Sequence, residues 1–266
     1  MSERGGCESM SYLVICVVAF VASGLTFFSG FGLGTILLPA FALFFAIEQA
    51  IALTAIVHFL NGLFKLLLVW RHIDRAVVMR FGLPAILGAL VGAWGLLWIA
   101  DAQPLLSYSL FGRDVEVIPV KLVVGILLLL FATAELSPAF RDMAFPASWM
   151  PFGGLLSGFF GGLSGMQGAL RSAFLVKAGL TKEVYVATGA AIAFLIDVSR
   201  LSIYMSQILT HRENLDYTLL GAAVVAAFSG AYIGNQYLKK ITMKSVQTTV
   251  AVLLFCVALG LVSGLL

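Results

Sequence analysis

The chain has 266 residues, of which 61% are hydrophobic and only 11% are charged. Ordinary globular domains carry roughly 25% charged residues, so a water-soluble fold of this size could not bury so much apolar surface. The net charge of +3 is too small to indicate a nucleic-acid partner. We therefore predict an all-α polytopic protein of the lipid bilayer, because the period-2 alternation of a β-barrel is missing.

Residues 1–9 form a polar tail before the first apolar run. The tail contains Glu3, Arg4 and Glu8, so it lacks the clear positive region of a signal peptide. The run after it is also longer than a typical signal core. We predict that this run, residues 10–29, is the first membrane span.

Ten apolar segments follow one another along the chain, and most are separated by polar residues. We place them at 10–29, 33–47, 50–70, 76–99, 118–137, 149–163, 167–179, 183–209, 216–238 and 245–265. Two of them, 33–47 and 167–179, are short for a span of about 20 residues. They either cross as half-helices sheltered by protein or dip in and return, which gives eight to ten spans.

The chain divides into two halves with the same pattern. Residues 138–148, which contain two prolines, separate a first membrane repeat (10–137) from a second (149–266). At an offset of 134 residues Gly34 falls on Gly168. At an offset of 142 the motif Gly88-Ala-Leu-Val-Gly92 falls on Gly230-Ala-Tyr-Ile-Gly234, and such small-xxx-small patterns predict closely packed helices.

The distribution of Lys and Arg predicts the orientation. If all ten segments cross the membrane, nine of these basic residues lie on one side and four on the other. If segments 33–47 and 167–179 instead enter and return on the same side, six basic residues lie on one side and seven on the other. The positive-inside rule therefore favours ten crossings with the nine-residue side in the cytoplasm. Five segments per half is an odd number, so the second repeat is inverted relative to the first, as in transporters that work by alternating access.

Glycine-rich breaks interrupt both halves, and duplicated breaks of this kind point to the midplane binding site of a transporter. A helix that restarts after a break has N–H groups without partners, and they attract anions. We predict that the two breaks meet in an anion cradle; the alternative is a plain tight turn. The cradle residues would be Gly30, Gly32, Gly34, Thr35, Ser164, Gln167 and Gly168.

Other polar residues at membrane depth complete the predicted substrate site. Arg171 has no acidic residue nearby in the sequence, which makes it the best candidate for a substrate contact. Asn61 lies on the matching helix of the first half. The aligned Thr54 and Thr188 either donate hydroxyls to an anion or bond back to their own helices.

Four ionisable residues are candidates for coupling or gating. Asp197 and Arg200 are three residues apart and share a helix face, which fits a coupling element or a self-neutralising structural pair. Lys65 either binds the ligand or extends to the membrane surface. His58 either relays a proton or is a hydrogen-bonded core residue.

Three features carry a resemblance to a known family. They are the start Gly30–Gly34 with Pro39 after it, the motif Val186-Ala-Thr-Gly189, and Asp74 and Asp216, each fourteen residues before a small-xxx-small helix. With these features nearly the whole chain resembles the TauE/SafE family of sulfite and organosulfonate exporters. The resemblance implies a bacterial inner-membrane transporter of small sulfur-containing or carboxylate anions.

The sequence thus predicts a secondary transporter that exports a small anion, driven by a proton gradient or by the membrane potential. No metal-ligand spacing, activated nucleophile or phosphate loop indicates an enzyme or a cofactor. A passive anion channel and a membrane scaffold without transport activity remain alternatives. The sequence does not fix the oligomeric state, and a homodimer stays open.

Overall fold

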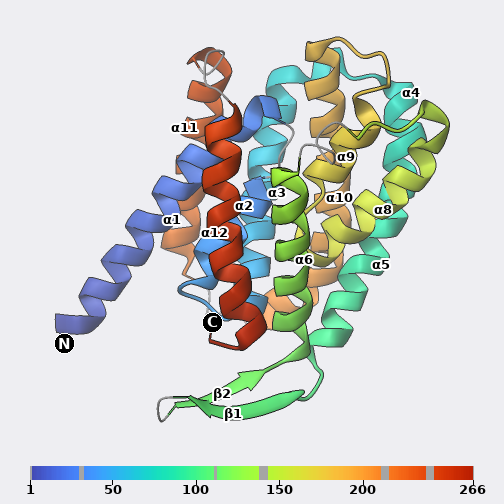
Figure 1. Ribbon diagram of the computed structural model, residues 1–266. Helices are drawn as coiled ribbons and strands as arrows, with labels where there is room; N and C mark the ends of the chain where they lie inside the picture. The colour runs from blue at the N-terminus through green and yellow to red at the C-terminus, as the bar shows by residue number, and fades with distance from the viewer. Residues whose placement is uncertain are drawn as a thin grey trace.

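The structure, a computed structural model, describes residues 2–29, 33–110, 113–137, 143–210, 216–237 and 243–265. It is a bundle of helices with one β-hairpin at one end (Figure 1). The helices are α1 (Ser2–Ser29), α2 (Leu33–Ala42), α3 (Ile47–Val69), α4 (Arg75–Val77), α5 (Leu83–Ala100), α6 (Pro119–Leu136), α8 (Met150–Ser164), α9 (Gly168–Leu175), α10 (Lys182–Thr210), α11 (Tyr217–Tyr237) and α12 (Met243–Ser263). A π-helical turn at Val78–Gly82 joins α4 to α5.

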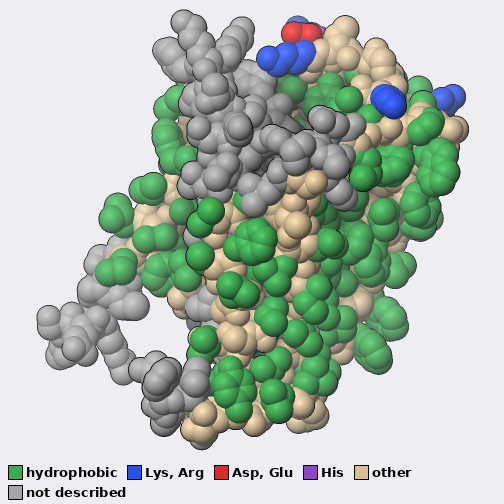
Figure 2. All heavy atoms as spheres, in the orientation of Figure 1, with side chains coloured by type: hydrophobic (Ala, Val, Ile, Leu, Met, Phe, Trp, Pro, Cys, Tyr) green, Lys and Arg blue, Asp and Glu red, His purple; other side chains and the backbone are tan. Residues whose placement is uncertain are grey.

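Several helices have the length and composition of membrane spans. Within the described residues, four apolar stretches are long enough to cross: Gln49–His72, Arg75–Ala100, Lys182–Met205 and Tyr217–Gly234. Four shorter apolar helices accompany them, at Met10–Thr26, Leu33–Ala42, Pro119–Ala134 and Leu254–Ser263. Figure 2 shows a surface rich in apolar side chains, with the visible Lys and Arg side chains gathered at one end. The predicted all-α polytopic membrane fold is confirmed.

In both halves of the chain, a glycine of the small-xxx-small motif lies in close contact with the backbone of a neighbouring helix. A Cβ atom on Gly88 of α5 would lie 2.1 Å from the carbonyl oxygen of Leu155 in α8. A Cβ atom on Gly230 of α11 would lie 2.0 Å from the carbonyl oxygen of Phe20 in α1. Only glycine lets two backbones approach this closely. The predicted packing role of the small-xxx-small motifs is therefore confirmed.

Corresponding helices of the two halves run in opposite directions. Near the start of α6, a Cβ on Gly125 would lie 2.7 Å from Val262 near the end of α12. The end of α3 likewise lies near the beginning of α10, where the backbone N–H of Asp74 donates to Thr188 Oγ1 over 2.9 Å. These antiparallel contacts agree with the inverted relation that the sequence predicts, which stays a prediction.

Helices α2 and α9 are half-helices. With ten and eight residues they are about 15 and 12 Å long, against a hydrocarbon core of about 30 Å. Every residue of α2 is buried. Helix α9 folds back beside the chain that leads into α8, where Phe145 N donates to Ala173 O over 3.0 Å and the rings of Phe145 and Phe174 stack. These helices fit the prediction of short segments sheltered by protein.

A β-hairpin lies between α5 and α6, where we expected only a polar loop. Strands β1 (Leu106–Leu110) and β2 (Arg113–Val117) pair antiparallel. Tyr108 Oη donates to the carbonyl oxygen of Ser263 over 2.5 Å, which ties the hairpin to the end of α12. The hairpin was missed because its alternation covers only a dozen residues, and the motif Gly112-Arg-Asp-Val-Glu116 reads as polar punctuation.

Candidate functional site

The two glycine breaks meet inside the bundle. A Cβ atom on Gly34, in the first turn of α2, would lie 3.2 Å from the carbonyl oxygen of Gly165 and 3.5 Å from His58 Cδ2. Gly165 separates α8 from α9 and has φ of +81°, a conformation that favours glycine. The predicted meeting of the breaks is confirmed at these residues. Gly30 and Gly32 lie outside the described residues.

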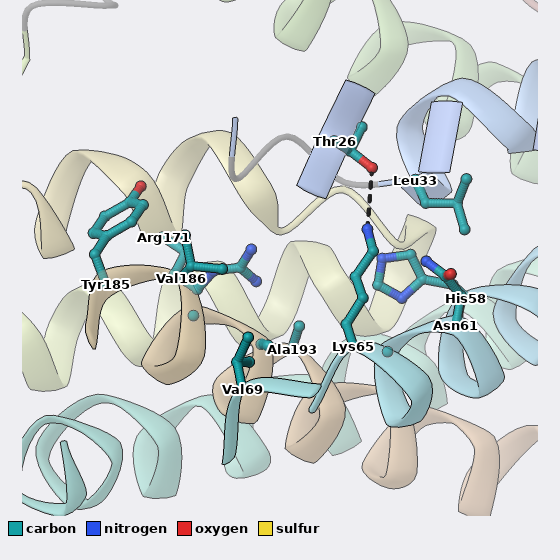
Figure 3. A pocket seen from close by; sticks show the side chains of 13 residues that line it. Thr26, Leu33, His58, Asn61, Lys65, Val69, Arg171, Tyr185, Val186 and Ala193 are labelled. Carbon is teal, nitrogen blue, oxygen red and sulfur yellow. Dashed lines mark hydrogen bonds between the residues drawn. The ribbon is translucent and has the colours of Figure 1, made fainter. Parts of the chain in front are cut away.

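A cavity opens beside this meeting point (Figure 3). The volume of the cavity is about 70 Å³, which is enough for several water molecules or one small ion. Its polar side chains come from both halves of the chain. The lining residues are Thr26, Leu33, His58, Asn61, Gly62, Lys65, Val69, Arg171, Tyr185, Val186, Gly189, Ala190 and Ala193.

The cavity extends toward one side of the membrane. Its inner end lies at Leu33 and His58, next to the meeting of the breaks, and its lining reaches Val69 and Tyr185 at the ends of α3 and α10. The basic residue Arg71 lies just after the end of α3, and the basic residue Lys182 is the first residue of α10. The cavity therefore faces the side that the positive-inside rule assigns to the cytoplasm.

Two cationic side chains dominate the cavity's polar lining. Lys65 Nζ donates to Thr26 Oγ1 over 3.4 Å, and Arg171 Nη1 donates to Gln167 Oε1 over 3.2 Å. In Figure 3 these side chains reach the cavity from α3 and α9. Gly189 of α10 borders the guanidinium, since a Cβ there would be in ordinary contact with Arg171 Nε at 3.6 Å. Among the described residues the lining contains no Asp or Glu, so this part of the site has the charge that attracts an anion.

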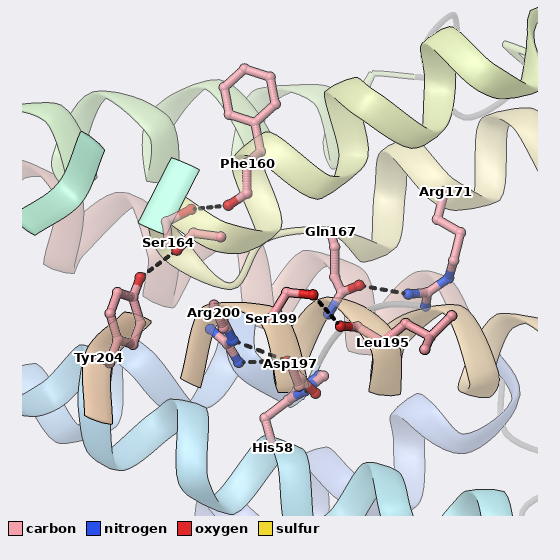
Figure 4. A network of polar contacts seen from close by, with 11 residues as sticks. His58, Phe160, Ser164, Gln167, Arg171, Leu195, Asp197, Ser199, Arg200 and Tyr204 are labelled. Carbon is pink, nitrogen blue, oxygen red and sulfur yellow. Dashed lines mark hydrogen bonds and ion pairs between the residues drawn. The ribbon is translucent and has the colours of Figure 1, made fainter. Parts of the chain in front are cut away.

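A buried polar network lies behind the cavity (Figure 4). His58 Nδ1 lies 2.5 Å from Asp197 Oδ2, and Asp197 Oδ1 accepts from Arg200 Nε over 3.0 Å. Arg200 Nη2 is 2.9 Å from the same oxygen. Asp197 and Arg200 are fully buried and do not line the cavity, whereas His58 does. The predicted ion pair on one helix face is confirmed, and a residue of the other half joins it.

Other predicted substrate contacts lie away from the cavity. Thr188 Oγ1 accepts the backbone N–H of Asp74 over 2.9 Å, and Ser164 Oγ donates to the carbonyl oxygen of Phe160 over 3.1 Å. Thr35 is a buried residue of α2, and Gly168 begins α9. Of the predicted substrate residues that the structure describes, Asn61 and Arg171 alone line the cavity itself. Asn61 Oδ1 accepts from Ser23 Oγ over 2.9 Å.

Sequence reasoning missed Thr26 and Tyr185 as lining residues. Thr26 offered no signal, because it lies within an apolar run. Tyr185 directly precedes Val186-Ala-Thr-Gly189, and Val186 and Gly189 also line the cavity. The position of this motif was therefore the available signal.

Asp74 and Asp216 have the same role in the two halves. Each begins a helix and caps it: Asp74 Oδ1 accepts from Val77 N over 3.0 Å, and Asp216 Oδ1 accepts from Leu219 N over 2.9 Å. Partial burial raises the pKa of Asp216, but hydrogen bonds from Leu219, Tyr12 and Thr218 outweigh it and lower the pKa below its ordinary value.

The comparisons with known proteins identify the family. The model of the sulfite exporter TauE/SafE family matches residues 15–261. No curated protein and no solved structure matches the chain significantly. Within the part of the chain that the structure describes, no group of three or more His, Cys, Asp or Glu residues could hold a metal ion. From residue 15 to residue 261, the chain is a member of the TauE/SafE family of membrane exporters.

Proposed function

We propose that this protein is a secondary transporter of the bacterial inner membrane that exports a small oxyanion, sulfite or an organosulfonate, by alternating access. The observation that supports the proposal best is the pairing of Lys65 and Arg171 in one cavity, one from each half of the chain. The family model names sulfite exporters. The activity proposed is transport rather than catalysis.

The donor chemistry of the cavity suits a sulfur oxyanion. A guanidinium is a planar fork that binds two oxygens of one anion, whereas an ammonium is a compact point charge. Arg171 and Lys65 together can therefore engage three oxygens of a pyramidal sulfite or a sulfonate group. The Asn61 side chain beside them adds polarity without adding negative charge.

The membrane potential supplies a driving force in the proposed direction. Moving one elementary charge through 100 mV is worth about 2.3 kcal/mol. An anion that enters the cavity from the cytoplasm and leaves on the other side moves with this field when the cell interior is negative. Export needs no additional coupling ion on this account.

Uptake of radiolabelled sulfite into proteoliposomes tests the proposal. The variants Arg171→Gln and Lys65→Gln should each lower the rate about tenfold or more, since a hydrogen bond to a charged group is lost. Arg80→Gln and Lys177→Gln are matched controls, because both residues are exposed. Unchanged rates in Arg171→Gln and Lys65→Gln would remove the cavity from the mechanism. Flux that does not saturate and shows no counterflow would instead indicate a channel.

A further inference from the structure

Three buried residues at the meeting of the two breaks carry donor atoms without hydrogen-bond partners in the described part of the chain. The atoms are Thr54 Oγ1, Gln167 Nε2, Arg200 Nη1 and Arg200 Nη2, of which Nη2 forms an ion pair with Asp197 Oδ1 over 2.9 Å. The three side chains are at most 1% exposed. Buried polar groups without partners are few in native proteins, because each one keeps the cost of losing water.

All three residues lie next to Gly34 or Gly165, at the contact of the two breaks, which we call the junction. A Cβ on Gly34 would lie 3.2 Å from Gly165 O and 3.8 Å from the methyl carbon Cγ2 of Thr54, so Thr54 packs beside the place where the breaks touch. A Cβ on Gly165 would lie 2.7 Å from Arg200 Nη1. The backbone N–H of Gln167 donates to Gly165 O over 3.2 Å, which fixes Gln167 beside the same glycine.

The junction is separate from the cavity. None of Thr54, Gln167 and Arg200 lines the cavity, although His58 and Leu33 at its inner end lie in the same region. Figure 4 shows Arg200 in the Asp197 network and Gln167 beside Arg171, whose Nη1 donates to Gln167 Oε1. The junction therefore adjoins the end of the cavity that His58 and Leu33 line.

The donor set of the junction defines its ligand. All three groups donate hydrogen bonds, both halves contribute, and one group is a cation. Asp197 engages Arg200 through Nε and Nη2 and leaves Nη1 directed at Gly165. We propose that the junction is a second binding station for the transported oxyanion, which the anion occupies after the cavity closes toward the cytoplasm. This inference rests on the proposed function.

The variant Thr54→Val tests the station because it removes one donor and keeps the shape of the side chain. Sulfite exchange in proteoliposomes should fall about tenfold, as expected for a lost hydrogen bond to a charged group. Sulfite should still raise the melting temperature of the purified variant as in the wild type, because Lys65 and Arg171 remain in the cavity. Thr54→Ser should restore exchange, and Thr133→Val, at an exposed threonine of α6, should leave it unchanged.

A second variant keeps the inference falsifiable should Thr54→Val fold poorly. Arg200→Lys keeps a cation for Asp197 and removes the unpartnered Nη1, and position 200 does not line the cavity, so exchange should fall and sulfite should still bind in the cavity. Normal exchange in both Thr54→Val and Arg200→Lys, with loss in Arg171→Gln, overturns the junction station alone. A wild-type protein that moves neither sulfite nor any organosulfonate overturns the proposed function and the station together.

Discussion

His58 Nδ1 lies 2.5 Å from Asp197 Oδ2, and this contact joins α3 of the first half to α10 of the second inside the bundle. Asp197 holds the fully buried Arg200 through its other oxygen. The Asp197 carboxylate thus contacts both His58 and Arg200, and it is the centre of the network behind the cavity.

Removing the charge of Asp197 should therefore destabilise the protein strongly. Asp197→Asn leaves the Arg200 guanidinium buried without an ionised partner, and breaking such a pair costs about 3–5 kcal/mol. The double variant Asp197→Leu/Arg200→Leu should recover much of that loss, since it removes both charges. Unfolding in detergent measures both effects. Asp101→Asn, at an exposed carboxylate, is the control and should leave stability unchanged.

Glycine contacts between α5 and α8 predict a position-dependent effect of added methyl groups. Gly92→Ala places a Cβ 2.0 Å from the carbonyl oxygen of Phe159, so the helices must separate, at a cost of about 1–3 kcal/mol or more. Gly95 lies on the same helix with nothing within 4 Å of a Cβ. Gly95→Ala should leave stability equal or higher, because alanine is the better helix former. Equal melting temperatures for the two variants would contradict the close packing.

The aligned threonines Thr54 and Thr188 should respond differently to the same substitution. Thr188→Val removes the acceptor for the Asp74 backbone N–H and should cost about 1 kcal/mol. Thr54→Val removes a hydroxyl without a partner in the described chain and should cost nothing or stabilise the cavity-open state. Thermal unfolding without ligand distinguishes the two. A larger loss in Thr54→Val than in Thr188→Val would contradict the assigned contacts.

The lowered pKa of Asp216 predicts a pH-dependent part of stability. A carboxylate whose pKa falls on folding stabilises the folded state above its ordinary value of about 4, and that contribution is lost as pH falls through the folded-state pKa. The melting temperature of the wild type should exceed that of Asp216→Asn near neutral pH. The difference should shrink below about pH 4. A difference that does not change with pH would show that the charge has no role.

The orientation of the cavity can be tested by labelling. In a background without native cysteines, Val69→Cys should react with a membrane-impermeant thiol reagent only from the cytoplasmic side, because Val69 lines the cavity at the end of α3, two residues before the basic Arg71. Gln103→Cys, at an exposed position before the β-hairpin, should react only from the opposite side. The reverse pattern would invert the assigned topology.

The sequence predicted the helices well because lipid imposes strong rules on composition. Segment 118–137 corresponds to α6 and segment 216–238 to α11, each within two residues at either end. The aligned glycines of the two halves also predicted which helices pack closely. Segments 33–47 and 167–179 extended beyond the ends of α2 and α9, since hydropathy does not distinguish an apolar turn from an apolar helix.

The candidate site was predictable in type but not in arrangement. The i,i+3 spacing of Asp197 and Arg200 predicts their pairing, because one helix carries both. The contact between His58 and Asp197 joins residues 139 positions apart, and no local spacing encodes it. The alignment of Thr54 with Thr188 suggested one shared role, but only Thr188 holds the backbone of Asp74.

The inverted halves carry their charges at unmatched positions. At the offset of 134 residues, Lys65 corresponds to Ser199 and Arg171 corresponds to Leu37. If the two halves exchange conformations, a cavity that opens to the outside would be lined by a hydroxyl group and an aliphatic side chain. The cavity that opens to the cytoplasm is lined by two cations at the corresponding positions. In the proposed transport cycle the anion would therefore bind more tightly on the cytoplasmic side than on the outer side, and its release to the outside would be faster.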